Sequence, residues 1–131
     1  MKGKDYATRK RSIDTISPYL LTSCIKNRKW DSLKLYIQQA NLPDENSSYA
    51  LHLVCEDLST PTHIIKMIYF AFPDAALCQD MDKRTPLFIA VEFCFLDATV
   101  FLSRQNPEVA LIRNGIGTTP LQLTLEDFGP N

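Results

Sequence analysis

Three segments of the chain repeat the same pattern of polar, apolar and acidic residues. They are residues 48–56, 84–92 and 118–126, whose aligned leucines, Leu51, Leu87 and Leu121, lie 36 and 34 residues apart. A period of this size is typical of proteins built from stacked units, in which each unit buries its apolar face against its neighbours. The repeat therefore predicts a row of similar units that share one core.

Each copy reads as a turn followed by a short helix. In the last copy, two glycines within 114–117 supply positive φ angles cheaply, and Thr119 is placed to cap a helix whose first residue is Pro120. In the preceding copy, Leu87, Ala90 and Val91 fall at the spacing of one helical face. A second helix is expected after Thr60-Pro61 in the first copy and from Asp97 in the next. Each unit is therefore predicted to be helix, loop, helix and turn.

A weaker copy precedes these three. Leu20, Cys24 and Leu33 correspond to residues 31 positions further along the chain, and the segment 73–77 matches 107–111. These matches set the expected organisation. We expect a basic, flexible N-terminal tail over 1–15 and a repeat domain over 16–131, with repeats at about 16–46, 47–82, 83–116 and 117–131.

These residues resemble the ankyrin repeat, a unit of about 33 residues that contains Thr-Pro-Leu-His-x-Ala. The segments 80–90 and 114–124 fit its signature best, and the resemblance covers residues 17–128. The Pro-acidic-x-Ala-Leu segments look like a variant frequent in proteins of single-celled algae. The resemblance implies an all-α, ankyrin-type solenoid of stacked helix-turn-helix repeats, about three and a half units long with a truncated last repeat.

The chain departs from the ankyrin pattern at two kinds of position. The turn glycine is kept only as Gly117, and its places in the earlier copies are taken by Ser47 and Lys83. A left-handed conformation there costs about 1–2 kcal/mol, so these two hairpins are expected to be reshaped or mobile. The motif histidine is kept only as His52, with Phe88 and Gln122 elsewhere, so its hydrogen bonds are expected to be mostly lost.

Composition favours a folded protein that stays inside the cell, in the cytoplasm, the nucleus or both. Apolar residues make up 45% of the chain and charged residues 22%, and no apolar run reaches the roughly 20 residues of a membrane span. The basic segment 1–11 is not followed by an apolar run, so it is not read as a secretory signal. The four cysteines lack the paired spacing of zinc or redox sites and are interpreted as buried, reduced thiols.

No catalytic, metal or cofactor site is predicted. Catalysis requires a nucleophile with a base, paired acids or a ligand cluster. The two histidines, His52 and His63, lie in a repeat motif and at the start of an outer helix, without a suitable neighbour in the sequence. We therefore expect a non-enzyme without a small-molecule substrate.

In ankyrin-repeat proteins the partner usually contacts the concave face, which consists of the turn hairpins and the exposed positions of the inner helices. Carried onto this sequence, the resemblance implies a partner-binding set that combines acidic and apolar side chains. The set is Leu53, Glu56, Asp57, Asp82, Lys83, Arg84, Ile89, Glu92, Phe93, Ile116, Leu123, Glu126 and Asp127. A row of acids beside apolar residues suits a basic, partly apolar protein segment; the alternative is an ordinary solvated helix face.

The preferred function is therefore a scaffold or adaptor that binds a protein of unknown identity. One alternative is a truncated structural segment of a larger repeat protein or assembly. Its C-terminal repeat is expected to leave Leu121, Leu125 and Phe128 partly uncovered, which would allow homo-oligomer contacts there. The other is a nucleic-acid or anionic-surface binder that uses the basic residues of the first eleven positions. A solvated tail is favoured over that second alternative because Asp5 and Asp14 lie nearby.

Overall fold

The computed structural model describes residues 19–128, which form α-helices and short 3-10 helices without a strand. The all-α prediction is confirmed. The expected tail at 1–15 lies outside these residues. In chain order the elements are α2 (Leu20–Lys26), α3 (Trp30–Leu33), η1 (Lys34–Asn41), α4 (Ala50–Cys55), α5 (Thr62–Ala71), η2 (Pro73–Leu77), α6 (Pro86–Glu92), α7 (Leu96–Gln105), η3 (Pro107–Leu111) and α8 (Pro120–Phe128).

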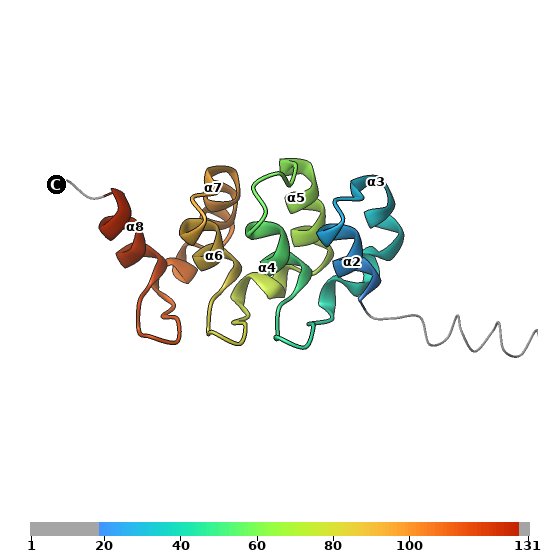
Figure 1. Ribbon diagram of the computed structural model, residues 1–131. Helices are drawn as coiled ribbons and strands as arrows, with labels where there is room; N and C mark the ends of the chain where they lie inside the picture. The colour runs from blue at the N-terminus through green and yellow to red at the C-terminus, as the bar shows by residue number, and fades with distance from the viewer. Residues whose placement is uncertain (1–18, 129–131) are drawn as a thin grey trace, which may run out of the picture.

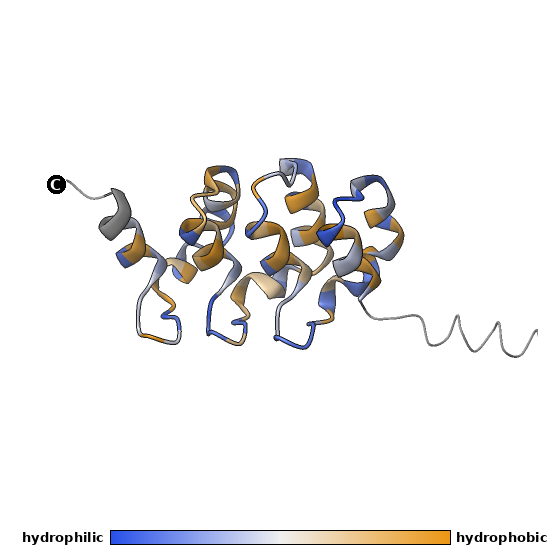
Figure 2. Cartoon of the chain, viewed as in Figure 1, coloured by the Kyte–Doolittle hydropathy of each residue, from blue (hydrophilic) through white to orange (hydrophobic). Residues whose placement is uncertain are grey.

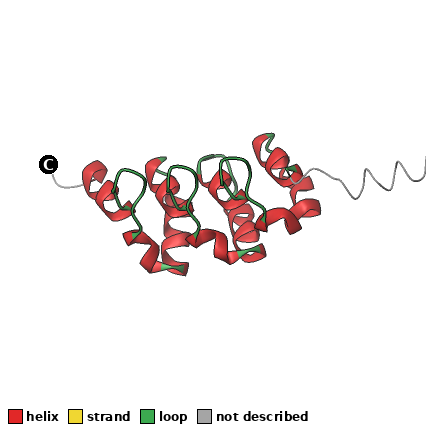
Figure 3. Cartoon of the chain, turned by 90° about the horizontal axis from the view of Figure 1, so that it is seen from below, coloured by secondary structure: helices red, strands yellow, loops and turns green. Residues whose placement is uncertain are grey.

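The helices form a row of pairs two layers deep (Figures 1 and 3). Four inner helices, α2, α4, α6 and α8, pack side by side in that order, and each of α4 and α6 also packs on the outer helix that follows it. The outer helices α5 and α7 contact one another. Hairpins that lead into the inner helices project from one edge of the row (Figure 1).

The core consists of the residues that the helical spacing selected. Leu51, Val54 and Cys55 on α4 are buried, as are Leu87, Ala90 and Val91 on α6, and Ile64, Ile65 and Ile68 bury the inner side of α5. These residues belong to one apolar cluster that runs from Leu21 to Val109. Figure 2 shows hydrophobic residues along the inner helices and mostly hydrophilic ones in the hairpins before α4 and α6.

The first helix pair differs from the prediction in register and regularity. α2 begins after Tyr19, as α4 begins after Tyr49, so Leu21 and Ile25 take the places expected for Leu20 and Cys24. The two helices are 30 residues apart rather than the expected 31, so Leu21, and not Leu20, aligns with the buried Leu51. Leu21 is accordingly fully buried, whereas Leu20 is only half-buried. The second helix of this pair is irregular: α3 passes into η1, which is kinked at Tyr36 (φ −120°).

The matching segments 73–77 and 107–111 form the same element. Each is a 3-10 helix with proline in its first turn, where the missing N–H leaves no donor unpaired. Ala75 and Val109 occupy the same position and are buried. The repeated sequence therefore specifies a third short helix that directs the chain from each outer helix to the next hairpin.

The three hairpins have one geometry, although only the last contains the turn glycine. In each, the first residue donates its N–H to the carbonyl of the fifth, from Asp44 to Ser48 (2.9 Å), Asp80 to Arg84 (2.9 Å) and Asn114 to Thr118 (2.8 Å). The fourth residue has positive φ: 61° at Ser47, 64° at Lys83 and 85° at Gly117. The expectation that the first two hairpins would be reshaped is wrong.

The first side chain of each hairpin holds this geometry in place. Oδ1 of Asp80 accepts hydrogen bonds from the N–H groups of Asp82 and Arg84, both at 2.9 Å. Asp44 and Asn114 accept the equivalent pairs of hydrogen bonds. Neighbouring hairpins are joined by backbone hydrogen bonds, from Met81 to Asn46 and from Gly115 to Asp82. These contacts offset the left-handed strain at Ser47 and Lys83.

His52 connects α4 to the hairpin of the following helix pair. Its Nδ1 accepts the N–H of Tyr49 at 3.0 Å, so Nε2 carries the proton and donates to the carbonyls of Cys78 (3.0 Å) and Arg84 (3.1 Å). At the equivalent position of α8, Oε1 of Gln122 accepts the N–H of Thr119 at 2.9 Å. The predicted loss of these hydrogen bonds is therefore wrong in part, because an amide oxygen replaces one of them.

The prediction of four buried thiols is wrong for two of them. Cys24 and Cys55 are buried, and burial raises the pKa of the Cys55 thiol. Cys78 is half-buried and Cys94 is exposed, because Cys94 lies in the loop after α6 at a φ of 58°. All four are free thiols.

Candidate interaction face

The hairpins and the inner helices form one face of the molecule, which we call the hairpin face. Most of the residues that the sequence assigned to partner binding lie on it with exposed or half-buried side chains. Those exposed are Glu56, Asp82, Lys83, Glu92, Phe93 and Ile116, and those half-buried are Asp57, Arg84 and Leu123. The structure therefore places nine predicted residues where a partner has access to them.

Two of the predicted residues are not accessible. Leu53 is 8% exposed and Ile89 only 1%. Leu53 and Ile89 lie on α4 and α6, which are each packed between two other inner helices and against an outer helix, so more than one stripe of their surface is covered. Ile89 is therefore a core residue rather than a contact residue. Leu53 offers a partner only the small part of its side chain that remains exposed.

Two further acids of the predicted set, Glu126 and Asp127, cannot be placed on the hairpin face. Glu126 and Asp127 belong to α8 by their backbone, but their side chains lie outside the described part of the structure. The acidic row is thus described only at Glu56 and Glu92.

Arg84 is the centre of the charge network on the hairpin face. Its guanidinium contacts Oδ2 of Asp80 (3.0 Å), Oε1 of Glu92 (2.8 Å) and Oδ2 of Asp82 (3.6 Å). Burial alone would lower the pKa of Arg84, but hydrogen bonds to Glu92 and Asp80 raise it. The network ties the hairpin to α6, so Glu92 is held by an intramolecular partner rather than left free.

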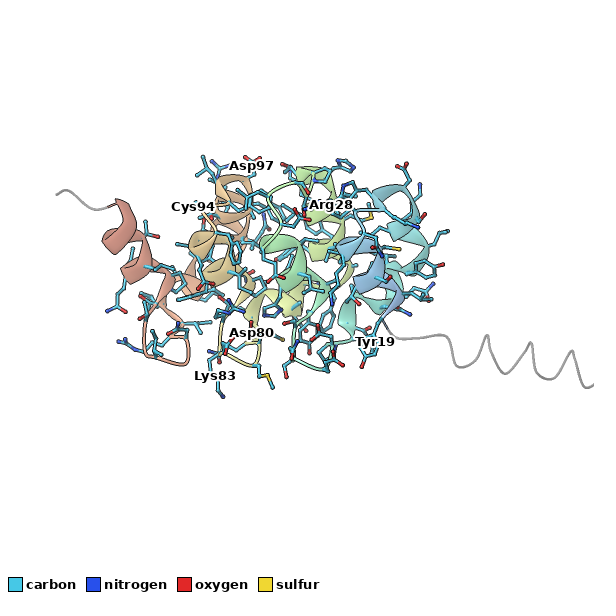
Figure 4. All side chains as sticks on the ribbon, viewed as in Figure 1. Tyr19, Arg28, Asp80, Lys83, Cys94 and Asp97 are labelled. Carbon is cyan, nitrogen blue, oxygen red and sulfur yellow. The ribbon has the colours of Figure 1, made fainter. Side chains whose placement is uncertain are left out.

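A second ion pair lies at the other edge of the face, between the loops that follow α2 and α4. Arg28 contacts Asp57 through Nε (3.0 Å) and Nη2 (3.4 Å). Burial raises the pKa of Asp57, but hydrogen bonds from Arg28 and Ser59 outweigh it and lower the pKa overall. Figure 4 shows Arg28 at the edge opposite to Asp80 and Lys83. The pair joins the first two helix pairs across this edge.

Glu56 lies between the two ion-pair networks. It lines a pocket of about 380 Å³ toward the hairpins and one of about 500 Å³ toward the helix loops, and Leu53 and Lys26 line both. Partial burial raises the pKa of Glu56, and Asp80 and Asp44 add to that rise while Arg84 and Lys26 oppose it. Among the described residues, no side chain forms an ion pair with Glu56 within 4.0 Å. Its carboxylate is therefore open to a partner's cation.

Sequence reasoning missed three residues of this face. Lys26 takes the place on α2 that Glu56 and Glu92 take on α4 and α6, but the one-residue error in register concealed it. Asp44 and Asp80 open the first two hairpins, and the recurrence of Asp, Asp and Asn at that position was the available signal. Asp80 is buried because the hairpin closes around it.

Among the side chains of residues 19–124, no group of three His, Cys, Asp or Glu residues is placed to hold a metal ion. His52, the buried histidine, uses both ring nitrogens in backbone hydrogen bonds. In the same part of the chain, no helix is both long and apolar enough to cross a membrane.

A scan against protein-family models finds no match for this chain, and a search of the curated proteins finds no similar protein.

Proposed function

We propose that this chain is a divergent ankyrin-repeat protein that acts as a non-catalytic scaffold or adaptor inside the cell. Its hairpin face would bind a basic, partly apolar segment of another protein. Three observations support the ankyrin assignment. The three hairpins have the same geometry, the later inner helices begin with Thr-Pro, and the inner helices pack side by side.

The observation that carries the binding proposal is the setting of Glu56. The pocket on its hairpin side is lined by four carboxylates, from Asp44, Glu56, Asp80 and Asp82, against two cations, from Lys26 and Arg84. Desolvation of a carboxylate without an ion-pair partner is unfavourable, and an incoming Lys or Arg side chain would relieve it. Phe93, which directly follows α6 and is 41% exposed, and Met81, which is exposed on the hairpin, supply apolar surface nearby.

The test is affinity capture from a cell extract with the wild-type chain and two charge-reversal variants. Glu56→Lys removes the open carboxylate, whereas Glu108→Lys makes the same charge change on η3, away from the hairpin face. We expect a protein that binds the wild type and Glu108→Lys and is lost with Glu56→Lys. Equal capture by all three proteins would contradict the proposal.

The chemistry of the partner is tested on the same material. Binding of the captured protein should require a Lys- or Arg-containing segment, found by deletion mapping, and substitution of those residues with Gln should weaken binding at least about tenfold. A partner segment that is acidic or uncharged would show that Glu56 does not recognise it.

A further inference from the structure

We propose that the outer helices carry a second docking site, a groove between α5 and α7 that takes an acidic amphipathic helix of a partner protein. The groove has a volume of about 540 Å³ and is lined only by residues of the outer helices α5 and α7. It shares no residue with the pockets around Glu56. The inference is therefore independent of the proposed function.

The groove follows from the spacing of residues on the two outer helices. Thr62, Lys66 and Phe70 lie four residues apart on α5, and Leu96, Val100 and Arg104 do so on α7. Residues at this spacing share one side of a helix. Two such stripes on adjacent helices form parallel walls about three turns long, which matches the shape of a helix laid between them.

The apolar part of this groove is exposed without serving the core. Phe70 is 63% exposed and Leu96 is 70% exposed, and Val100 is exposed beside them. The inner sides of the same helices are filled by Ile64, Ile65 and Ile68 on α5 and by Ala98 and Leu102 on α7. Single exposed apolar residues are common, but several that line one groove mark an interaction surface.

An aromatic cluster fixes the groove in a defined shape. The ring of Phe70 meets the rings of Tyr69 (5.1 Å between centroids) and Phe101 (6.1 Å) at steep angles, and Tyr69 meets Phe101 at 5.3 Å. Tyr69 is buried, so the cluster is anchored in the core. Such edge-to-face packing holds Phe70 in place before a partner binds, which is the property of an anchor residue.

The charges of the groove specify an acidic partner. Lys66 lies over the Phe101 ring at 5.9 Å from its centroid, and Arg104 lies one turn further along on α7. Asp97 is the one acid that lines the groove, and it accepts a hydrogen bond from the Thr62 hydroxyl (3.4 Å) at the far end. Two cations beside the exposed aromatic residues therefore complement a helix that carries Asp or Glu next to Leu or Phe anchors.

A peptide selection tests this inference with the full chain. A displayed library of short helix-forming peptides with random charges is selected on the wild-type protein, and the peptides obtained are measured against Phe70→Ala, Lys66→Glu and the hairpin-face variant Glu56→Lys. We expect peptides with acids beside Leu or Phe at helical spacing. Phe70→Ala and Lys66→Glu should each weaken their binding at least about tenfold, and Glu56→Lys should leave it unchanged.

Several outcomes would overturn the inference. They are a selection without enrichment, enriched peptides that lack acids, and binding that Phe70→Ala leaves intact in a variant whose circular dichroism matches the wild type. Light scattering adds a further outcome. If the wild type self-associates and Phe70→Ala is a monomer, the groove is occupied by a second copy of the chain rather than by an acidic helix.

Discussion

The hairpin face and the outer-helix groove differ in what holds their side chains. On the hairpin face, acids form ion pairs with arginines of the same chain, as Glu92 does with Arg84 and Asp57 with Arg28. In the groove, Phe70 and Leu96 are exposed and the cations Lys66 and Arg104 have no ion pair among the described residues. The paired charges of the hairpin face therefore support the fold and leave Glu56 available to a partner, whereas in the groove both cations are available.

The largest expected difference in stability is between alanine variants of two phenylalanines, one in the core and one exposed in the groove. Phe88 on α6 is buried, so Phe88→Ala should lower the free energy of unfolding by about 3–5 kcal/mol through a cavity. Phe70→Ala should lower it by less than about 1 kcal/mol, because only ring-edge contacts are lost. Urea unfolding measures both. Equal losses would mean that Phe70 belongs to the core and not to a docking site.

Removal of the buried carboxylate from the second hairpin is expected to have the next largest effect. Asp80→Ala leaves two backbone N–H groups without their acceptor and breaks an ion pair of Arg84, so we expect a loss of about 2–4 kcal/mol. Asp82→Ala is the matched control, since its side chain is 76% exposed and 3.6 Å from Arg84, and should cost less than about 0.5 kcal/mol. Similar midpoints for the two variants would refute a structural role of the hairpin network.

The titration of His52 should make the free energy of unfolding depend on pH. Burial lowers the pKa of His52 below its unfolded value of 6.5, and a protonated Nδ1 would face the N–H of Tyr49. Below pH 6.5 the unfolded chain takes up the proton, whereas the folded chain takes it up only at a lower pH. The stability present above pH 6.5 is therefore lost as pH falls, by about 1 kcal/mol between pH 7.5 and 5.5.

The His52→Gln variant isolates this effect. It keeps an acceptor for the N–H of Tyr49, as Gln122 does for Thr119, and does not titrate. The raised pKa of Glu56 acts in the opposite direction at lower pH, but it is common to both proteins and cancels in their difference. A wild type and variant with parallel stability curves between pH 7.5 and 5.5 would show that His52 titrates equally in both states.

The smallest expected effect concerns the turn position that distinguishes the hairpins. Lys83→Gly should raise the free energy of unfolding by about 0.5–1 kcal/mol, because glycine removes the left-handed strain at φ 64° but adds freedom to the unfolded chain. Gly117→Ala should lower it by a similar amount; an added Cβ has no atom within 4 Å, so only its φ of 85° matters. If Lys83→Gly destabilises the protein, the hairpin contacts depend on the lysine side chain itself.

The sequence predicts the helices of the middle of the chain because their signals agree. Leu87, Ala90 and Val91 share one helical face, Thr85 caps the helix and accepts the N–H of Phe88 at 3.2 Å, and Pro86 starts it. Local propensity, capping and the apolar pattern all indicate the same element. The first helix pair lacks these signals, and the alignment predicted between its first helix and α4 was wrong by one residue.

The candidate site was less predictable, because exposure depends on packing between units. Nothing in the pattern around Ile89 indicates that both neighbours of α6 would cover it. The left-handed turns at Ser47 and Lys83 were misjudged for a related reason. Propensity counts the strain of the residue itself, whereas the hairpin is held by the Asp side chain three residues earlier and by hydrogen bonds to the adjacent hairpin.

The central claim is that the hairpin face is the binding surface. Its most direct test is amide hydrogen exchange of the chain with and without its captured partner. The account predicts that bound partner slows exchange in the hairpins 44–48 and 80–84 and in the ends of α4 and α6, and leaves α5 and α7 unchanged. Protection confined to α5 and α7, or absent from residues 44–93 altogether, would contradict it.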